Sequence, residues 1–333
     1  MRFQLAKIWV AVSYIMRINR PATGALTLIA LLLASPARRP PAVDRSVAVT
    51  FDDLPAPAAG VVANDVVGIE ALTRKLLGAV QKYSVPAVGF VNEDKLFVEG
   101  AGRDEVDGRI RLLRLWLNAG LELGNHSYSH RDLNIVPLDQ FQADVLRGER
   151  ITRPLMTAKG WRLRYFRHPF LHVGSNLQTR RAFETFLARH GYTVAPVTVD
   201  NDDFVYAAAY ARALRDGETA SATRIADDYL RYMNEVFSFF EEVSRKVTGR
   251  EIPQVLLLHA NALNADRFGA LAEALVRRGY RFVPLAQALE DPAYRLPDEF
   301  VGAPGNSWFN HWEVTAGRKP VPTPAPPPWI GAR

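Results

Sequence analysis

Short β-rich runs alternate with amphipathic helical stretches from Ser46 onward, and this alternation constrains the fold more than any other feature of the chain. Such alternation is typical of parallel sheets whose faces are covered by helices. Several of the runs are continuously apolar, as strands buried on both faces are. We expect seven strands, over 47–51, 87–91, 121–124, 164–167, 193–199, 254–258 and 281–283.

Helical patterns fill the gaps between these strands, and no internal repeat interrupts the alternation. The predicted helices cover 66–83, 109–119, 139–159, 177–190, 221–247 and 266–278. A chain of 333 residues with 48% hydrophobic residues can bury the core that such a fold needs. The sequence therefore predicts a single α/β domain built on a parallel sheet.

The first 37 residues have the pattern of an export signal. Arg17 and Arg20 precede the apolar stretch 25–34, and small residues follow it at 35–37. We expect a signal peptide, with Met16 as an alternative start, or an uncleaved N-terminal anchor that would be the protein's only membrane contact. In both cases the folded part is exported, to the periplasm or the medium.

The remaining chain divides into a linker, a folded domain and a C-terminal extension. The expected bounds are 38–45 for the linker, 46–290 for the domain and 291–333 for the extension, whose stretch 320–328 is rich in proline. A proline-rich stretch of this kind is predicted to be an extended tail without a core of its own.

The net charge of +6 does not indicate nucleic-acid binding. Four basic residues and no acidic residue lie in the leader, and without them 37 lysines and arginines oppose 35 acidic residues. No later stretch combines clustered cations with aromatic residues, as a groove for a nucleic-acid backbone requires. The absence of cysteine excludes thiolate nucleophiles, cysteine-ligated zinc, iron–sulfur clusters and disulfides. No feature points to a protein partner.

Two adjacent carboxylates, Asp52 and Asp53, follow the apolar strand 47–51. The carboxyl ends of parallel strands are where catalytic groups collect. Neighbouring carboxylates repel each other unless a cation or a shared proton relieves them. The alternative is an exposed turn or helix cap, which aspartate pairs often supply.

His126 and His130 come directly after the strand 121–124. Two histidines four residues apart project from one helical face, and both imidazoles then reach one metal ion. With Asp53 as third ligand, they form the two-histidine, one-carboxylate set of catalytic metal sites. Solvated surface histidines are the alternative interpretation.

A rival pair with the same spacing, His168 and His172, is a weaker metal site. Pro169 directly after His168 favours extended geometry there, so the two rings need not share a face.

His259 ends another apolar strand, where a histidine can act as a general acid near neutral pH. A satisfied core histidine is the alternative. Asp200, Asp202 and Asp203 lie at the end of the strand 193–199, where a carboxylate can orient a neighbouring histidine or arginine. A calcium-type loop would need more oxygen ligands at regular spacing.

These residues carry a resemblance to the polysaccharide deacetylase, or NodB-homology, superfamily, carbohydrate esterase family four. The five motifs of the family appear in order over about 46–285. They are matched by Thr50 to Leu54, His126 to His130, Arg167 to Phe170, Asp203-Phe204 and Leu257 to His259. The resemblance implies an irregular (β/α)7 barrel, in agreement with the predicted strands.

The resemblance also implies roles for these residues. Asp53, His126 and His130 would hold a divalent metal, zinc first, with cobalt, nickel or manganese as alternatives. Asp52 would be the base, and Arg167 would orient it. The remaining implied roles are a general acid at His259, a carboxylate that tunes the acid at Asp203, backbone N–H groups near Phe170 that stabilise the oxyanion, and substrate-binding side chains at Phe170 and Phe204.

The implied activity is hydrolysis of N-acetyl groups on an amino-sugar glycan or oligosaccharide. Leu54, Phe204 and Leu171 depart from the family's usual residues, and all three alter the cleft walls rather than the metal ligands. The segments 205–250 and 291–333 could cap the groove and favour a small or chain-end substrate. Alternatives are a related hydrolase of another small amide or an O-acetyl ester, and an inactive carbohydrate-binding protein of the same fold.

Overall fold

The computed structural model describes residues 45–304 and 307–331, so the predicted leader and all of the linker except Arg45 lie outside the described residues. Seven strands form one sheet in which every pairing is parallel. They are β1 Arg45–Leu54, β2 Val88–Val91, β3 Glu122–Asn125, β4 Tyr165–Phe166, β5 Thr193–Val194, β6 Gln254–His259 and β7 Tyr280–Phe282.

The sheet has the order β5-β4-β3-β2-β1-β6, and β7 pairs with the beginning of β1. Val199, a few residues after β5, forms a parallel bridge with Leu256 of β6. This bridge connects the two ends of the strand path, so the sheet closes into an irregular barrel. The predicted α/β fold of the (β/α)7 type is confirmed.

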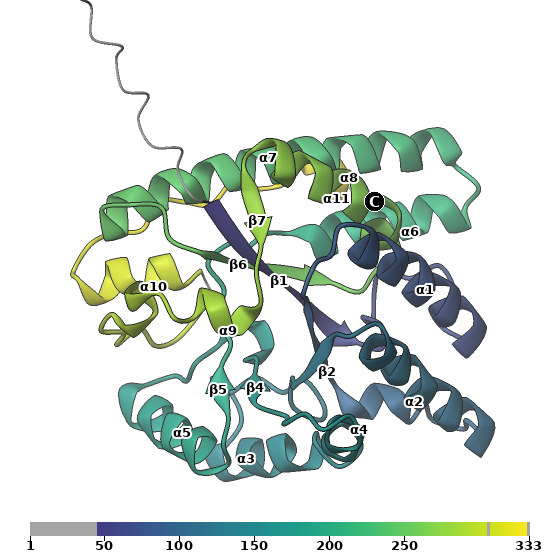
Figure 1. Ribbon diagram of the computed structural model, residues 1–333, viewed down its shortest axis with the longest axis horizontal. Helices are drawn as coiled ribbons and strands as arrows, with labels where there is room; N and C mark the ends of the chain where they lie inside the picture. The colour runs from purple at the N-terminus through teal and green to yellow at the C-terminus, as the bar shows by residue number, and fades with distance from the viewer. Residues whose placement is uncertain (1–44, 305–306, 332–333) are drawn as a thin grey trace, which may run out of the picture. The chain divides into compact units, whose positions relative to one another are not determined.

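Helices cover the outside of the strands, with α1 and α2 on one flank and α3, α4 and α5 on another (Figure 1). The α-helices are α1 Val66–Lys82, α2 Arg103–Asn118, α3 Leu138–Arg147, α4 Thr152–Ala158, α5 Leu177–Arg189, α6 Asp203–Arg215, α7 Thr219–Thr248, α8 Ala262–Arg277, α9 Leu285–Ala288, α10 Trp308–Thr315 and α11 Pro328–Gly331. Short 3-10 helices are η1 Glu93–Leu96, η2 Pro169–Leu171 and η3 Pro292–Arg295. Among the described residues, no helix has both the length and the apolar character to cross a membrane.

The core is built around β1, whose residues 46–52 are all buried. Phe51 packs edge-on against Trp116 of α2 and Phe268 of α8, with ring centroids 5.5 Å apart in both pairs. Replacing so buried a ring by alanine typically costs about 3–5 kcal/mol of stability. The strand that carries Asp52 and Asp53 is therefore held firmly against helices α2 and α8.

Three local predictions are corrected by the structure. The strand predicted over 193–199 stops at Val194, since Pro196 has no N–H to continue the ladder. The helix predicted over 139–159 is two helices, α3 and α4. The chain breaks at Gly148, where a Cβ would lie 2.6 Å from the backbone of Ser127. Helix α6 was not predicted at all.

The two segments that were expected to cap a groove pack mainly against the helical layer. Helix α7 packs on α6, α8 and α10, and α11 packs on α6. The aromatic residues of α10, Trp308, Phe309 and Trp312, are buried, so they anchor the core rather than forming a sugar platform. The backbone N–H of Trp308 donates to Val197 O at 2.7 Å, which ties the C-terminal extension to the barrel.

Candidate metal centre

The two adjacent carboxylates at the end of β1 point in different directions. Asp52 is 3% exposed and faces the barrel interior. Asp53 has φ 69°, a left-handed conformation that bends the chain just after the strand pairing with β6 ends. Non-glycine residues in this region store about 1–3 kcal/mol of strain and are found at functional sites. The bend lets the neighbouring carboxylates serve different partners.

His126 and His130 lie in a loop after β3, so the prediction that they share a helical face is wrong. Ser127 and His130 have φ values of 65° and 52°, which no helix contains. The Asn125 side chain accepts from Ser127 N at 2.7 Å and donates to Val145 O at 3.0 Å, fixing the start of the turn. The turn brings the two imidazole centroids to 4.8 Å, as a helical face would.

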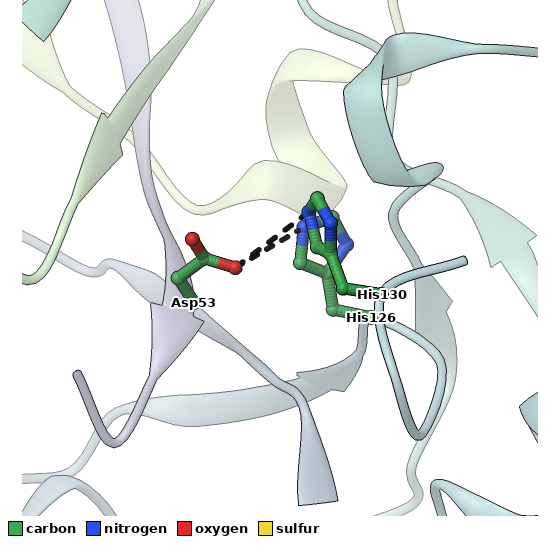
Figure 2. A group of neighbouring side chains, drawn as sticks. All are labelled: Asp53, His126 and His130. Atoms are coloured by element: carbon green, nitrogen blue, oxygen red, sulfur yellow. Dashed lines mark ion pairs between the residues drawn. The ribbon is translucent and has the colours of Figure 1, made fainter. Parts of the chain in front are cut away.

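The predicted ligand set of Asp53, His126 and His130 converges (Figure 2). Their ligand atoms all lie within 4.8 Å of one another, and among the described residues no other group of three or more such side chains does so. Asp53 Oδ1 is 3.9 Å from His126 Nε2 and 3.7 Å from His130 Nε2. Residues distant in sequence therefore face one point in space.

The protonation states at this point fit a cation. His126 Nδ1 lies 2.8 Å from the Arg167 carbonyl oxygen, which can only accept, so Nδ1 carries the proton and the Nε2 lone pair faces Asp53. Burial lowers the pKa of His126 well below its usual value, and the nearby His130 adds to this effect. Burial also lowers the pKa of His130. Neutral imidazoles facing a carboxylate oxygen are the ligands that zinc and similar divalent ions prefer.

Asp53 stays ionised in these surroundings. Burial would raise the pKa of its carboxyl, but the positive charges of Lys95 and His259 outweigh burial and hold this pKa well below the usual value. Lys95 was not singled out in the sequence, although it lies just beyond the carboxyl end of β2. Its Nζ is 2.9 Å from Asp53 Oδ1, the oxygen that faces both histidines.

Arg167 from the end of β4 supports Asp52, as the resemblance implied. Its guanidinium is fully buried and contacts both oxygens of Asp52 at 3.3 and 3.4 Å. The same group donates to Thr50 Oγ1 and to Ala195 O, both at 3.0 Å, so its position is set from three sides. Burial raises the pKa of Asp52 to about 6 even though Arg167 and His259 oppose the rise.

Asp203 and His259 form a second pair across from Asp52. His259 Nδ1 is 2.7 Å from Asp203 Oδ1, and the backbone N–H of His259 donates to Asp203 Oδ2 at 2.9 Å. Asn264 and Asn261 donate to the same Oδ2 at 2.7 and 3.2 Å. Burial disfavours the charged imidazole, but the Asp203 carboxylate outweighs burial and raises the pKa of His259 to about 9. The site thus pairs a buried carboxylate with an imidazole that holds its proton.

The predicted substrate-binding rings both lie on the surface beside these groups. Phe170 is 54% exposed and packs edge-on against the His130 ring at 4.5 Å. Phe204 is 53% exposed and lies 6.2 Å from the His259 ring. Two exposed rings beside the candidate metal ligands and His259 can form walls for a sugar ring.

The rival histidine pair does not form a metal site. His168 is buried against the rings of Phe166 and Phe183, and burial lowers its pKa to about 3. His172 instead bonds Asp132 at 2.8 Å. The backbone of His168 is extended, with φ −67° and ψ 124°, as the following proline predicted.

Asn264 and Tyr229 are further residues that the sequence did not reveal. The Tyr229 hydroxyl of α7 donates to Asn264 Oδ1 at 2.7 Å, so α7 supports the Asp203–His259 pair from behind. No pattern in the sequence signals this contact, because its partners belong to different helices.

Residues 39–195 match the model of the family described as polysaccharide deacetylase. Over this stretch, the chain is similar to the polysaccharide deacetylase family. The match supports a hydrolase of the polysaccharide deacetylase type, which acts on amide bonds. No curated protein sequence gives a significant match to this chain.

Several solved structures are similar to this chain. Peptidoglycan deacetylase PdaC from Bacillus subtilis is 22% identical, with a TM-score of 0.46, over 76% of this chain and 93% of that one. A family 4 carbohydrate esterase from Streptomyces lividans, in complex with acetate, is 22% identical with a TM-score of 0.43, over 72% and 92%. A family 4 pseudoenzyme from Bacillus anthracis is 16% identical with a TM-score of 0.45, over 75% and 66%. The residue roles therefore rest on this chain's own geometry.

Proposed function

We propose that this protein hydrolyses the N-acetyl group of an amino-sugar glycan or oligosaccharide with the help of a divalent cation. The observation that carries the proposal is the convergence of Asp53, His126 and His130 beside a buried carboxylate and a protonated imidazole. A binding protein needs no base and acid next to its ligands, whereas amide hydrolysis needs both.

Asp53, His126 and His130 would hold the cation, and zinc is our first candidate because its usual ligands are nitrogen and carboxylate oxygen. When bound, a divalent cation supplies a Lewis acid for the acetyl carbonyl and lowers the pKa of a water molecule. The carbonyl oxygen of Arg167 orients His126 for this task. Cobalt, nickel and manganese are alternatives.

Asp52 is assigned the general base. Its carboxylate lies 3.7 Å from His126 Nε2, so it stands directly beside the proposed ligands and can take a proton from the attacking water. Arg167 holds this carboxylate in place and favours its ionised form. The water oxygen then joins the acetyl carbon, and a backbone N–H near Phe170 is assigned the stabilisation of the oxygen that becomes negative.

His259 is assigned the general acid. Because Asp203 occupies its Nδ1, the Nε2 proton is the one available for the leaving amine. When the carbon–nitrogen bond breaks, this proton goes to the nitrogen, and acetate and a free amine leave. Asp203 keeps the imidazole charged before the transfer.

Phe170 and Phe204 are proposed to contact the sugar on either side of the acetamide. Their exposure leaves both rings free to pack on a substrate from solvent. We further propose that the protein is exported to the periplasm or the medium, where acetylated glycans are found. Fractionation of cells that produce the full chain tests this location.

Acetate release from chitooligosaccharides tests the function directly. The purified protein is treated with a chelator, and zinc or cobalt is then restored at one equivalent. We expect activity to disappear and to return with the metal. The variant Asp132→Asn, whose carboxylate pairs with His172 outside the site, is the matched control and should stay active. Acetate release that persists without metal, or none after metal is restored, would count against the proposal.

A further inference from the structure

Lys95 occupies the candidate metal centre although no motif of the sequence includes it. Its Nζ lies 2.9 Å from Asp53 Oδ1, the same oxygen that both histidines face. The side chain is only 20% exposed, so water screens this contact weakly. A cation of the chain itself therefore sits on the oxygen that a metal would need.

Hydrogen bonds fix the backbone around Lys95, and this holds the lysine next to Asp53. The buried Glu93 carboxylate accepts from Ile151 N and Thr152 N at 2.9 and 2.6 Å, which ties η1 to the start of α4. Asp94 N donates to Tyr128 O at 3.1 Å, which ties η1 to the loop of the two histidines.

Two further contacts complete this frame. Arg109 donates to the Lys95 carbonyl oxygen at 3.3 Å. The Asn92 side chain donates to the His126 carbonyl oxygen at 2.6 Å. The turn that carries the lysine and the loop that carries a ligand are thus one hydrogen-bonded unit.

The charge of Lys95 next to Asp53 Oδ1 affects the binding of a divalent cation. The Lys95 ammonium lies 2.9 Å from Asp53 Oδ1, whereas the Nε2 atoms of His126 and His130 lie farther from it, at 3.9 and 3.7 Å. A divalent cation on the same oxygen would meet a positive charge at close range. The repulsion between two positive charges is several times stronger in a partly buried site than in water.

We propose that Lys95 is a resident counter-ion of Asp53 that weakens the binding of the divalent cation and so keeps the metal exchangeable. Lys95 acts here as a positioning residue, through Asp53. The inference rests on the metal site of the proposed function.

Metal affinity of the full chain tests the inference without any activity assay. Cobalt(II) is titrated into the metal-free protein and followed by its visible absorption, and zinc is measured by competition with a chromophoric chelator. We expect Lys95→Met to bind both ions at least about tenfold more tightly than wild type. Lys95→Arg, which keeps the charge, should bind within about threefold of wild type.

Two further variants complete the test. Lys95→Gln removes the charge while keeping a polar side chain, and it decides the question if Lys95→Met does not fold. Lys159→Met removes an exposed lysine that donates a hydrogen bond to Asn118. The metal affinity of this variant should equal that of wild type.

Each outcome has one meaning. Neutral variants that bind cobalt as weakly as wild type, or more weakly, overturn the role of Lys95 and leave the metal site standing. If wild type and all variants bind no metal, the proposed function itself fails, and this inference fails with it. Tightening in both neutral variants, but not in Lys95→Arg, supports the proposal.

Discussion

The charge of His259 depends on one carboxylate, and Asp203→Asn removes that charge with almost no change in shape. His259 Nδ1 lies 2.7 Å from Asp203 Oδ1, and the imidazole is 16% exposed. Asp203 raises the pKa of His259 from its ordinary 6.5 to about 9 against the opposing effect of burial. In the variant Asp52, Asp53 and Asp200 remain as negative partners, but the strongest partner and its hydrogen bond are lost, so we expect the pKa to fall to about 6.5 or below.

The size of the effect follows from the shift itself. A rise from 6.5 to about 9 corresponds to roughly 3 kcal/mol at 1.36 kcal/mol per pKa unit. Because the folded pKa is raised, this stabilisation is complete below the unfolded pKa and is lost as the pH rises through about 9. Between pH 6 and 9.5, wild type should therefore lose about 3 kcal/mol of unfolding free energy that the variant does not lose.

Proton NMR of the metal-free protein measures the pKa directly. The His259 ring signal is assigned with His259→Gln and followed from about pH 5 to 10. Urea unfolding at both ends of this range measures the stability. The control Asp132→Asn removes the partner of His172 and should leave the His259 midpoint unchanged. A midpoint near 9 in Asp203→Asn would refute the reasoning.

Three further changes test the neighbouring groups. Asp52→Asn should lower kcat by about 10²–10⁴ while cobalt titration shows wild-type metal affinity, because the base is lost and the ligands remain. Arg167→Met leaves Asp52 buried without its partner and should lower the urea unfolding free energy by about 3–5 kcal/mol. Phe170→Ala removes an exposed ring and should raise KM for chitooligosaccharides up to about tenfold with little change in kcat. Unchanged values in these assays would contradict the respective assignments.

The strand positions could be predicted because buried parallel strands are apolar on both faces, as β1 and β6 are here. The predicted strand beyond Val194 failed because Pro196 lacks a donor, which an apolar pattern does not register. Helix α6 was missed because its small, alanine-rich residues give little amphipathic contrast after the acidic run at 200–203.

The candidate site was predicted in its members but not in its local geometry. His126 and His130 were expected on a helix, and two positive φ values make a turn instead that gives the same convergence. Lys95, Asn264 and Tyr229 escaped prediction because their roles arise only from tertiary contacts. Spacing along the chain reports on neighbours in sequence and carries no signal for such partners.

Anomalous diffraction from crystals soaked in zinc tests the central claim most directly. With data collected on both sides of the zinc absorption edge, the account predicts one strong anomalous peak within bonding distance of Asp53 Oδ1, His126 Nε2 and His130 Nε2. A zinc peak bonded to other side chains, or no peak at this site at full zinc occupancy elsewhere, would contradict the account.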